Sequence, residues 1–175
     1  NGYANNVYGY QNTINIIPRQ LFQYRPYTEI SYYQDRYDNE YFDGNFHQNF
    51  FKSLNFNFGI TKHSYSGHYK NSDFDKWQGR FNLNFAPSAK LNFFANVNYA
   101  HIQKGLNEGI DPDIVNLGDK EIMLSGTNST MINTDAYEIK ERFDVDLGTV
   151  FTAGKSSFSK IQFYVSNSMR HYRDE

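Results

Sequence analysis

Cysteine is missing from this sequence of 175 residues, and long apolar runs are missing as well. The first absence excludes disulfide bonds, thiolate metal sites and thiol nucleophiles. The second excludes a membrane-spanning helix, which needs about 18 or more apolar residues in a row. The chain opens at Asn1 without a basic stretch followed by an apolar one. We therefore expect either a removed signal peptide or an internal piece of a longer protein.

Charge of one sign is also scarce. The chain has 17 Lys and Arg against 19 Asp and Glu, which gives a net charge of −2 and a pI near 6.2. No overall basic field would attract nucleic acid, so nucleic acid is not an expected partner. The glycines show neither dinucleotide-binding nor P-loop spacing. These absences close common sequence routes to an enzyme, and we expect no catalytic function.

Aromatic and amide side chains dominate what is present. The chain has 16 Phe and 15 Tyr, so aromatics reach 18%, yet the mean hydropathy is only −0.74. It also has 21 Asn, a residue that competes with the backbone for hydrogen bonds and disfavours helix interiors. This composition favours an all-β fold.

Apolar and polar side chains alternate along several segments. In the clearest one, Leu54, Phe56, Phe58 and Ile60 alternate with amides, glycine and threonine. This is the period of a β-strand with one apolar face. The predicted strands cover about residues 28–33, 41–50, 54–69, 77–85, 91–100, 139–151 and 161–166.

Three features favour a membrane barrel over a soluble sheet. Several predicted strands exceed the soluble average of about five or six residues, and a tilted transmembrane strand needs about 9–11. Short connections such as "APSAK" alternate with long ones such as "KNSDFDK", which is the asymmetry between periplasmic turns and extracellular loops. Charges and amides lie opposite the Phe rows, as a water-filled interior requires. The predicted fold is an antiparallel up-and-down transmembrane β-barrel, of which about seven or eight strands are present.

The chain is predicted to form a single barrel segment over residues 1–175. Residues 1–25 form a weakly defined opening segment. Residues 104–136 lack periodicity and are rich in Gly, Asn, Asp and Ser, so we expect a long extracellular loop there.

The alternation also predicts which side chains face water and which face outer-membrane lipid. The pore-lining candidates are Asp43, Asn57, Arg80, Asn82, Asn96, Arg142, Asp144, Asp146 and Lys160. The lipid-facing candidates are Phe56, Phe58, Phe81, Leu83, Phe85, Phe93, Val97, Phe143, Val145, Leu147 and Phe163.

Two residues break this alternation of apolar and polar side chains. Phe94 lies on the polar side, and Glu141 lies on the apolar side of its strand. A charge on the lipid face costs roughly 2–4 kcal/mol at the midplane, so we expect Glu141 near a rim or outside the bilayer.

Tyr and Trp near strand ends are predicted to form aromatic girdles, although aromatics also favour strands in general. These are Tyr32, Tyr41, Tyr65, Tyr69, Trp77, Tyr99 and Tyr137.

Four short segments, taken in order, resemble landmarks of a porin family of Bacteroidota and related phyla. They are "YRPYTEISYYQ" (24–34), "HQNFFKSLNFNFGI" (47–60), "SGHYKNS" (66–72) and "GLNEGID" (105–111). The likeness covers about residues 1–111, and the remainder follows only by pattern. It implies an outer-membrane β-barrel of a Gram-negative bacterium that admits small solutes passively. Barrels of this kind usually finish on an aromatic residue, whereas this chain stops at "MRHYRDE", so we expect a missing C-terminal part.

The predicted function is an outer-membrane porin-like channel for passive diffusion of small solutes. One alternative is the barrel portion of a TonB-dependent outer-membrane receptor, which encloses a plug domain. Another is a soluble carbohydrate-binding β-sandwich. The sequence leaves the solute and the oligomeric state open.

The charged and imidazole groups give no sign of a catalytic or metal site. Asp144 and Asp146 share a face beside Arg142, so a ladder of opposite charges explains them better than an acid–base pair. The five His lack the spacing of metal ligands, and the acids of "NEGIDPD" do not fit an EF-hand. We expect no metal, no cofactor and no catalytic residues.

Overall fold

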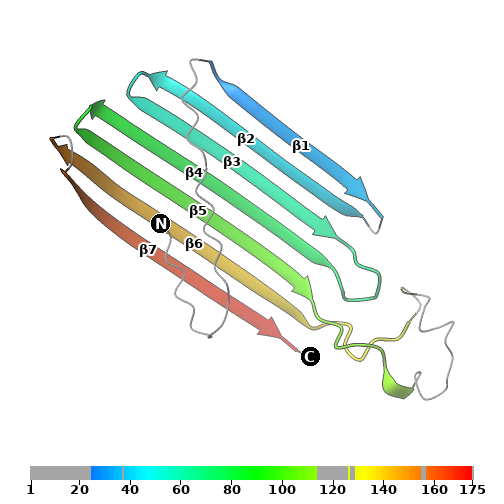
Figure 1. Ribbon diagram of the computed structural model, residues 1–175. Coiled ribbons are helices and arrows are strands. Elements are labelled where there is room, and N and C mark those ends of the chain that lie inside the picture. The colour runs from blue at the N-terminus through cyan, green and yellow to red at the C-terminus, as the bar shows by residue number, and fades with distance from the viewer. Residues whose placement is uncertain (1–24, 37, 114–125, 127–128, 155–156, 175) are drawn as a thin grey trace.

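The structure is a single antiparallel sheet of seven strands that follow one another in sequence order (Figure 1). This computed structural model describes residues 25–36, 38–113, 126, 129–154 and 157–174. The strands are β1 (Tyr27–Asp35), β2 (Asn39–Phe51), β3 (Leu54–Tyr65), β4 (Phe74–Ser88), β5 (Leu91–Gly105), β6 (Tyr137–Ala153) and β7 (Ser157–Arg173). The predicted all-β, up-and-down arrangement is confirmed. The opening segment 1–25 lies outside the described residues except for its last residue.

Most of the strands are long, and the alternation of apolar and polar side chains accompanies the backbone pairing over most of their length. β4 and β5 have 15 residues each, and β6 and β7 have 17 each, about three times the usual length. Several predicted strand ends are wrong. β5 and β7 continue to Gly105 and Arg173, past the predicted ends near residues 100 and 166. β3 instead stops early, at Tyr65 and not at residue 69. Gly67 takes a φ of +80°, which ends the extended backbone, and the Ser72 hydroxyl then donates to the Tyr69 carbonyl in a turn. No helix in the described part of the chain is long and apolar enough to cross a membrane.

The two ends of the sheet differ in the length of their connections (Figure 1). At one end, here called the turn end, the strand bounds leave residues 52–53, 89–90 and 154–156 as connections. At the other, called the loop end, they leave residues 36–38, 66–73 and 106–136. The predicted alternation of short and long connections therefore holds for five of the six connections, and only 36–38 is short at the loop end.

The long connection 106–136 is closed at its root by a side chain from a neighbouring loop. Asn71 Nδ2 donates to the Leu106 carbonyl at 3.0 Å and to the Ala136 carbonyl at 2.8 Å. The Leu106 amide also donates to the Ala136 carbonyl, and Ile110 pairs with Met131 in an isolated antiparallel bridge. Hydrogen bonds thus hold the two ends of this connection side by side where they leave β5 and β6.

Register sorts the side chains onto two faces, since residues directly opposite in an antiparallel pair share a face. One row across β3 to β7 is apolar: Phe58, Phe81, Val97, Val145 and Val165. The adjacent row, on the opposite face, is polar: Asn57, Asn82, Asn96, Asp146 and Tyr164. The two-residue period therefore survives every strand pairing.

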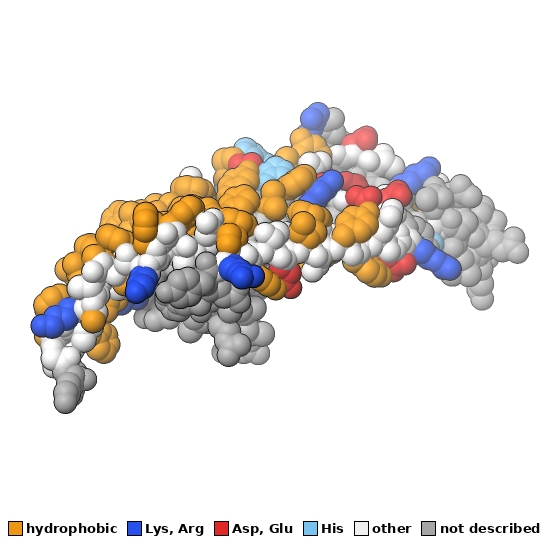
Figure 2. Space-filling view, turned by 90° about the horizontal axis from the view of Figure 1, so that it is seen from above, with side chains coloured by type: hydrophobic (Ala, Val, Ile, Leu, Met, Phe, Trp, Pro, Cys, Tyr) orange, Lys and Arg blue, Asp and Glu red, His pale blue; other side chains and the backbone are white. Residues whose placement is uncertain are grey.

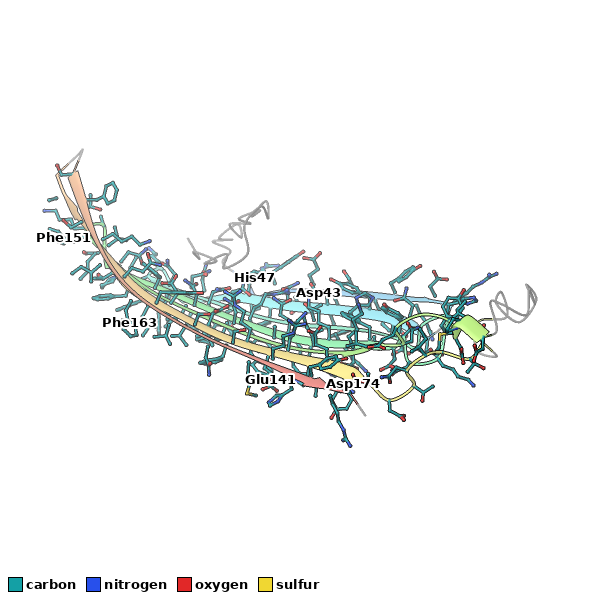
Figure 3. The ribbon with its side chains drawn as sticks, turned by 90° about the horizontal axis from the view of Figure 1, so that it is seen from below. Asp43, His47, Glu141, Phe151, Phe163 and Asp174 are labelled. Atoms are coloured by element: carbon teal, nitrogen blue, oxygen red, sulfur yellow. The ribbon has the colours of Figure 1, made fainter. Side chains whose placement is uncertain are left out.

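The sheet is bent, so that one of its faces is concave and the other is convex. Figure 3 shows Asp43 and His47 on the concave side and Glu141 and Phe163 on the convex side. Figure 2 shows the hydrophobic side chains gathered along the convex side. The polar face is called the concave face below, and the apolar face is called the convex face.

Apolar side chains are exposed on the convex face and do not form a core. Phe58 is 44% exposed, Phe93 43% and Phe163 62%. The buried hydrophobic residues in the described ranges are Met131 and Ala136, and both belong to the connection 106–136. The sheet therefore presents a continuous apolar surface, of a size that soluble monomers rarely leave uncovered.

Successive hairpins are staggered along the strands. From the common row given above, the turn end lies four residues away at Leu54 of β3, six at Leu91 of β5 and eight at Ser157 of β7. Each hairpin of two strands thus extends two residues beyond the one before it, a shift of one residue per strand. The oblique line of turns is visible in Figure 1.

We predict that Asn71→Asp weakens the root of the long connection. The change keeps the shape and the tolerance for positive φ but removes the amide donors, so the unfolding free energy should fall by about 1–3 kcal/mol. Hydrogen exchange at the Leu106 amide should accelerate. Gln78→Glu is the matched control, because it makes the same exchange of an amide for a carboxylate on the concave face, where Gln78 has no side-chain hydrogen bond within the described ranges. Equal effects of both substitutions would contradict the clamp.

Candidate functional site

The concave face carries the polar side chains that could meet a solute. Every predicted pore-lining residue lies on this face, and every predicted lipid-facing residue lies on the convex face. The alternation in the sequence thus assigned the pore-lining and the lipid-facing candidates to opposite faces, as the sheet does. Their contact with water and with lipid stays a prediction.

The first cluster on the concave face centres on Arg80 of β4. Its guanidinium reaches across β3 and donates to Asp43 at 2.8 Å and Asn45 at 3.0 Å, both on β2, and to Thr61 of β3 at 3.0 Å. Asn45 and Thr61 also donate to Asp43, so that this carboxylate receives three side-chain partners. The cluster holds three strands in one register.

Gly59 makes this reach possible. A Cβ at this position would lie 2.9 Å from Arg80 Nε and 2.7 Å from Asn45 Oδ1. The absence of a side chain on β3 therefore leaves the path along which the guanidinium crosses. Reasoning from the sequence missed Gly59, Asn45 and Thr61, although a glycine on the polar parity beside an Arg was a signal for such a crossing.

A second cluster joins β6 to β7 around Asp144. Arg142 Nε donates to both carboxylate oxygens at 3.0 and 2.8 Å, and the Tyr164 hydroxyl donates at 3.0 Å. Ser166 Oγ adds a further hydrogen bond. The expected pairing of opposite charges is therefore present, although Lys140 pairs with Glu138 and not with Asp144.

Amides link the middle of the concave face from β4 to β7. Asn82 Nδ2 donates to Asn96 Oδ1 at 2.9 Å, and Asn96 Nδ2 donates to Asp146 at 3.2 Å. Gln162 Nε2 donates to the other oxygen of Asp146 at 2.6 Å. Asp146 has amide partners and, in the described ranges, no ion pair. The row is a chain of side-chain hydrogen bonds that runs across four strands.

Phe94, the large residue on the polar side, is accommodated by a glycine. A Cβ on Gly148, which is opposite Phe94 in register, would lie 2.4 Å from the Phe94 ring. The ring covers the exposed backbone of this glycine, and Lys160 Nζ lies 5.2 Å from the ring centroid. The predicted pore-lining Lys160 thus lies at the turn end, held over an aromatic ring.

Glu141 lies on the convex face of β6 towards the loop end, between Phe143 and Ile139 of the same face. It accepts from His101 at 3.0 Å and from the Tyr99 hydroxyl at 3.5 Å. The same row holds Trp77, with Lys62 Nζ 5.3 Å from its ring centroid. Polar partners thus surround the charge, as its expected place near a rim requires.

The predicted girdle needs a correction in part. Tyr32, Trp77, Tyr99 and Tyr137 lie on the convex face, in agreement with the interpretation as a girdle. Two of the predicted girdle residues are wrong, because register places both of them on the concave face and gives them ring contacts there. These are Tyr41 and Tyr65. Tyr69 lies in the connection 66–73 and belongs to no strand.

The described residues do not bring any three His, Asp or Glu together so as to hold a metal ion. No family model matches the chain, and neither a curated protein nor a solved structure matches it. The geometry of the two faces therefore carries the functional argument.

We predict that Gly59→Ala displaces the Arg80 guanidinium. Replacing Gly by Ala within a strand should stabilise by about 0.5–1 kcal/mol, and Gly79→Ala, which meets open space, should show this gain. Gly59→Ala should lose it because the Arg80 contacts break. In an Arg80→Ala background the Asn45 amide also loses its hydrogen bond to Arg80, so the difference between the two glycine substitutions in unfolding free energy should shrink, as a double-mutant cycle would measure. A full gain from Gly59→Ala alone would contradict the crossing.

Proposed function

We propose that this chain is part of a transmembrane β-barrel of a Gram-negative outer membrane, and that its concave face lines a channel for passive diffusion of small solutes. The observation that carries the proposal is the uncovered apolar band of the convex face. Outer-membrane lipid would cover this band, and water and small solutes would contact the concave face.

The height of the band suits a bilayer. On β4 it runs from Trp77 to Phe85, on β5 from Leu91 to Tyr99 and on β6 from Phe143 to Phe151, nine residues in each case. At about 3.3 Å per residue this is roughly 27–30 Å along the strand. A strand tilted by about 35–45° then covers about 20–25 Å of the membrane normal, close to the apolar height of outer-membrane barrels.

The stagger of the hairpins supports the same conclusion. A shift of one residue, about 3.3 Å, for each strand spacing of about 4.8 Å corresponds to a tilt near 35° if the turns lie in one plane. Strands in closed transmembrane barrels tilt by roughly 35–45°. The register of this sheet is therefore suited to barrel closure with its turns at one membrane surface.

The two edge strands support a larger, closed sheet. β1 pairs with β2 only and β7 with β6 only, among the strands in the described part of the chain. Free backbone donors and acceptors cannot remain unpaired in lipid, so an open sheet would not be stable there. Strands from beyond this sheet would have to complete the ring. A soluble sandwich would need a second sheet over the convex face, whereas all strands of the described ranges belong to one sheet.

We predict different accessibility for cysteines placed at two adjacent positions of β5. The chain has no native cysteine, so single-cysteine variants can be made directly. In lipid vesicles, Asn98→Cys on the concave face should react with a membrane-impermeant maleimide, while Val97→Cys on the convex face should be protected. Both should react once the protein is unfolded in urea. Equal reaction of the two folded variants would contradict the assignment of the faces.

We also predict that the complete protein conducts ions in a planar bilayer, and that its selectivity depends on the concave face. Arg80→Gln together with Arg142→Gln should shift the reversal potential in a salt gradient toward cation preference. Lys62→Gln on the convex face is the control and should have no effect. A protein that inserts but does not conduct would retain the barrel and refute the channel.

A further inference from the structure

Basic side chains gather on the concave face near the loop end. Register places Lys76 of β4, Lys140 of β6 and Arg170 of β7 in one row, with Ile102 of β5 between the first two. Lys104 follows two residues after Ile102 on the same face. Lys76, Lys104, Lys140 and Arg170 are called the mouth cluster below. Four adjacent strands each contribute one cation, although the chain as a whole has a net charge of −2.

One carboxylate within the strands opposes this cluster. Glu138 accepts from Lys140 Nζ at 2.8 Å and also pairs with Arg170. Its single negative charge compensates one positive charge of the two that it contacts.

The other two cations lack such a partner. Lys76 and Lys104 form no ion pair within the described ranges. Lys104 borders an open cavity of about 380 Å³, together with Tyr65, Asn107 and Glu108. Glu108 is the one acid of this lining, and it lies beyond ion-pair distance of Lys104. Asp174 and Glu108 both lie within reach of the Tyr172 hydroxyl, and Tyr172 is opposite Glu138 in register. The four cations therefore face three acids, which leaves a net charge of +1.

Deeper in the concave face the situation differs. Arg80 is paired with Asp43 and Arg142 with Asp144, so these guanidinium groups are already neutralised locally. On the concave face, the lysines without an ion pair in the described ranges are thus Lys76 and Lys104 at the loop end and Lys160, over the Phe94 ring, at the turn end. A cleft lined by one sign of charge raises the local concentration of ions of opposite sign.

We propose that the mouth cluster is an anion-recruiting site, which concentrates small carboxylate- or phosphate-bearing solutes at the loop-end entrance of the channel. This inference rests on the proposed function, because the loop end is an entrance only if the concave face lines a channel. The electrostatic attraction itself follows from the placement of the four cations.

The attraction can be measured without conduction. A cysteine at Gln78, on the concave face two residues from Lys76, would be reacted with an anionic sulfonate and with a cationic trimethylammonium methanethiosulfonate reagent. The ratio of the two rates removes any effect of the thiol's own reactivity. Relative to free cysteine, the ratio should favour the anionic reagent, and Lys76→Gln with Lys104→Gln should lower that preference by at least about twofold at low salt. At about 1 M salt, where the Debye length is near 3 Å, the effect should largely disappear.

The matched control removes two cations elsewhere. Lys62→Gln with Lys90→Gln produces the same change in net charge, but Lys62 lies on the convex face and Lys90 at the turn end. The control should leave the rate ratio unchanged. Equal reductions in both double variants, or none in the Lys76 and Lys104 variant, would overturn the inference.

A second measurement separates this inference from the channel itself. In the conducting complete protein, Lys76→Gln with Lys104→Gln should shift the reversal potential toward cations, and millimolar phosphate or malonate should reduce chloride current less than in the parent protein. Absence of conductance with an intact rate preference would refute the channel while supporting the anion site. Normal conductance with no rate preference would retain the channel and refute the anion site.

Discussion

The structure depends on the register of its strands. Alternating side chains form one apolar and one polar face only if the apolar residues of neighbouring strands lie opposite one another. A slip of one residue in any pairing would bring Asn rows onto the apolar face and Phe rows onto the polar face beyond that point. The six pairings keep one register through their central rows, and the two register shifts, at Asn49–Phe51 and Phe85–Ser88, lie next to turn-end connections. The Arg80 crossing over Gly59 and the packing of Phe94 onto Gly148 both fix the register locally, since each large side chain fits over one glycine.

The division of labour between the faces follows from this constraint. The concave face forms the specific contacts: ion pairs, amide rows and hydroxyl donors that link several strands. The convex face contributes few directed interactions and instead leaves aromatic and aliphatic area exposed. Stability of such a sheet depends strongly on what solvates its convex face, because that surface replaces the core that a soluble domain of this length would bury.

The sequence was most informative where one physical rule acts alone. Alternation predicted seven strands and the side on which each candidate residue lies, and the loss of alternation predicted the long connection to within a few residues. Boundaries set by a single backbone conformation were less accessible. Gly67 ends β3 four residues earlier than alternation suggests, because a side-chain pattern does not report φ.

Contacts between strands could be predicted less well than the strands themselves. The partners of Arg80 and the glycine beneath it depend on pairing offsets that a single sequence does not encode explicitly. Tyr41 and Tyr65 were misassigned for a different reason, because their position near strand ends was weighed without the parity that they share with Asp43 and Asn57. Phe94 was noticed as an exception, yet its explanation required the position of Gly148 on a different strand.

The closed root of the connection 106–136 has a consequence for how this protein can vary. Because Asn71 and the bridge between Ile110 and Met131 fix the exit and return of the chain, the spacing between the ends of β5 and β6 does not depend on strand pairing alone. A longer connection would raise the entropic cost of loop closure only slowly, since that cost grows with the logarithm of loop length. An insertion beyond the bridge should therefore leave the pairing of β5 with β6 intact.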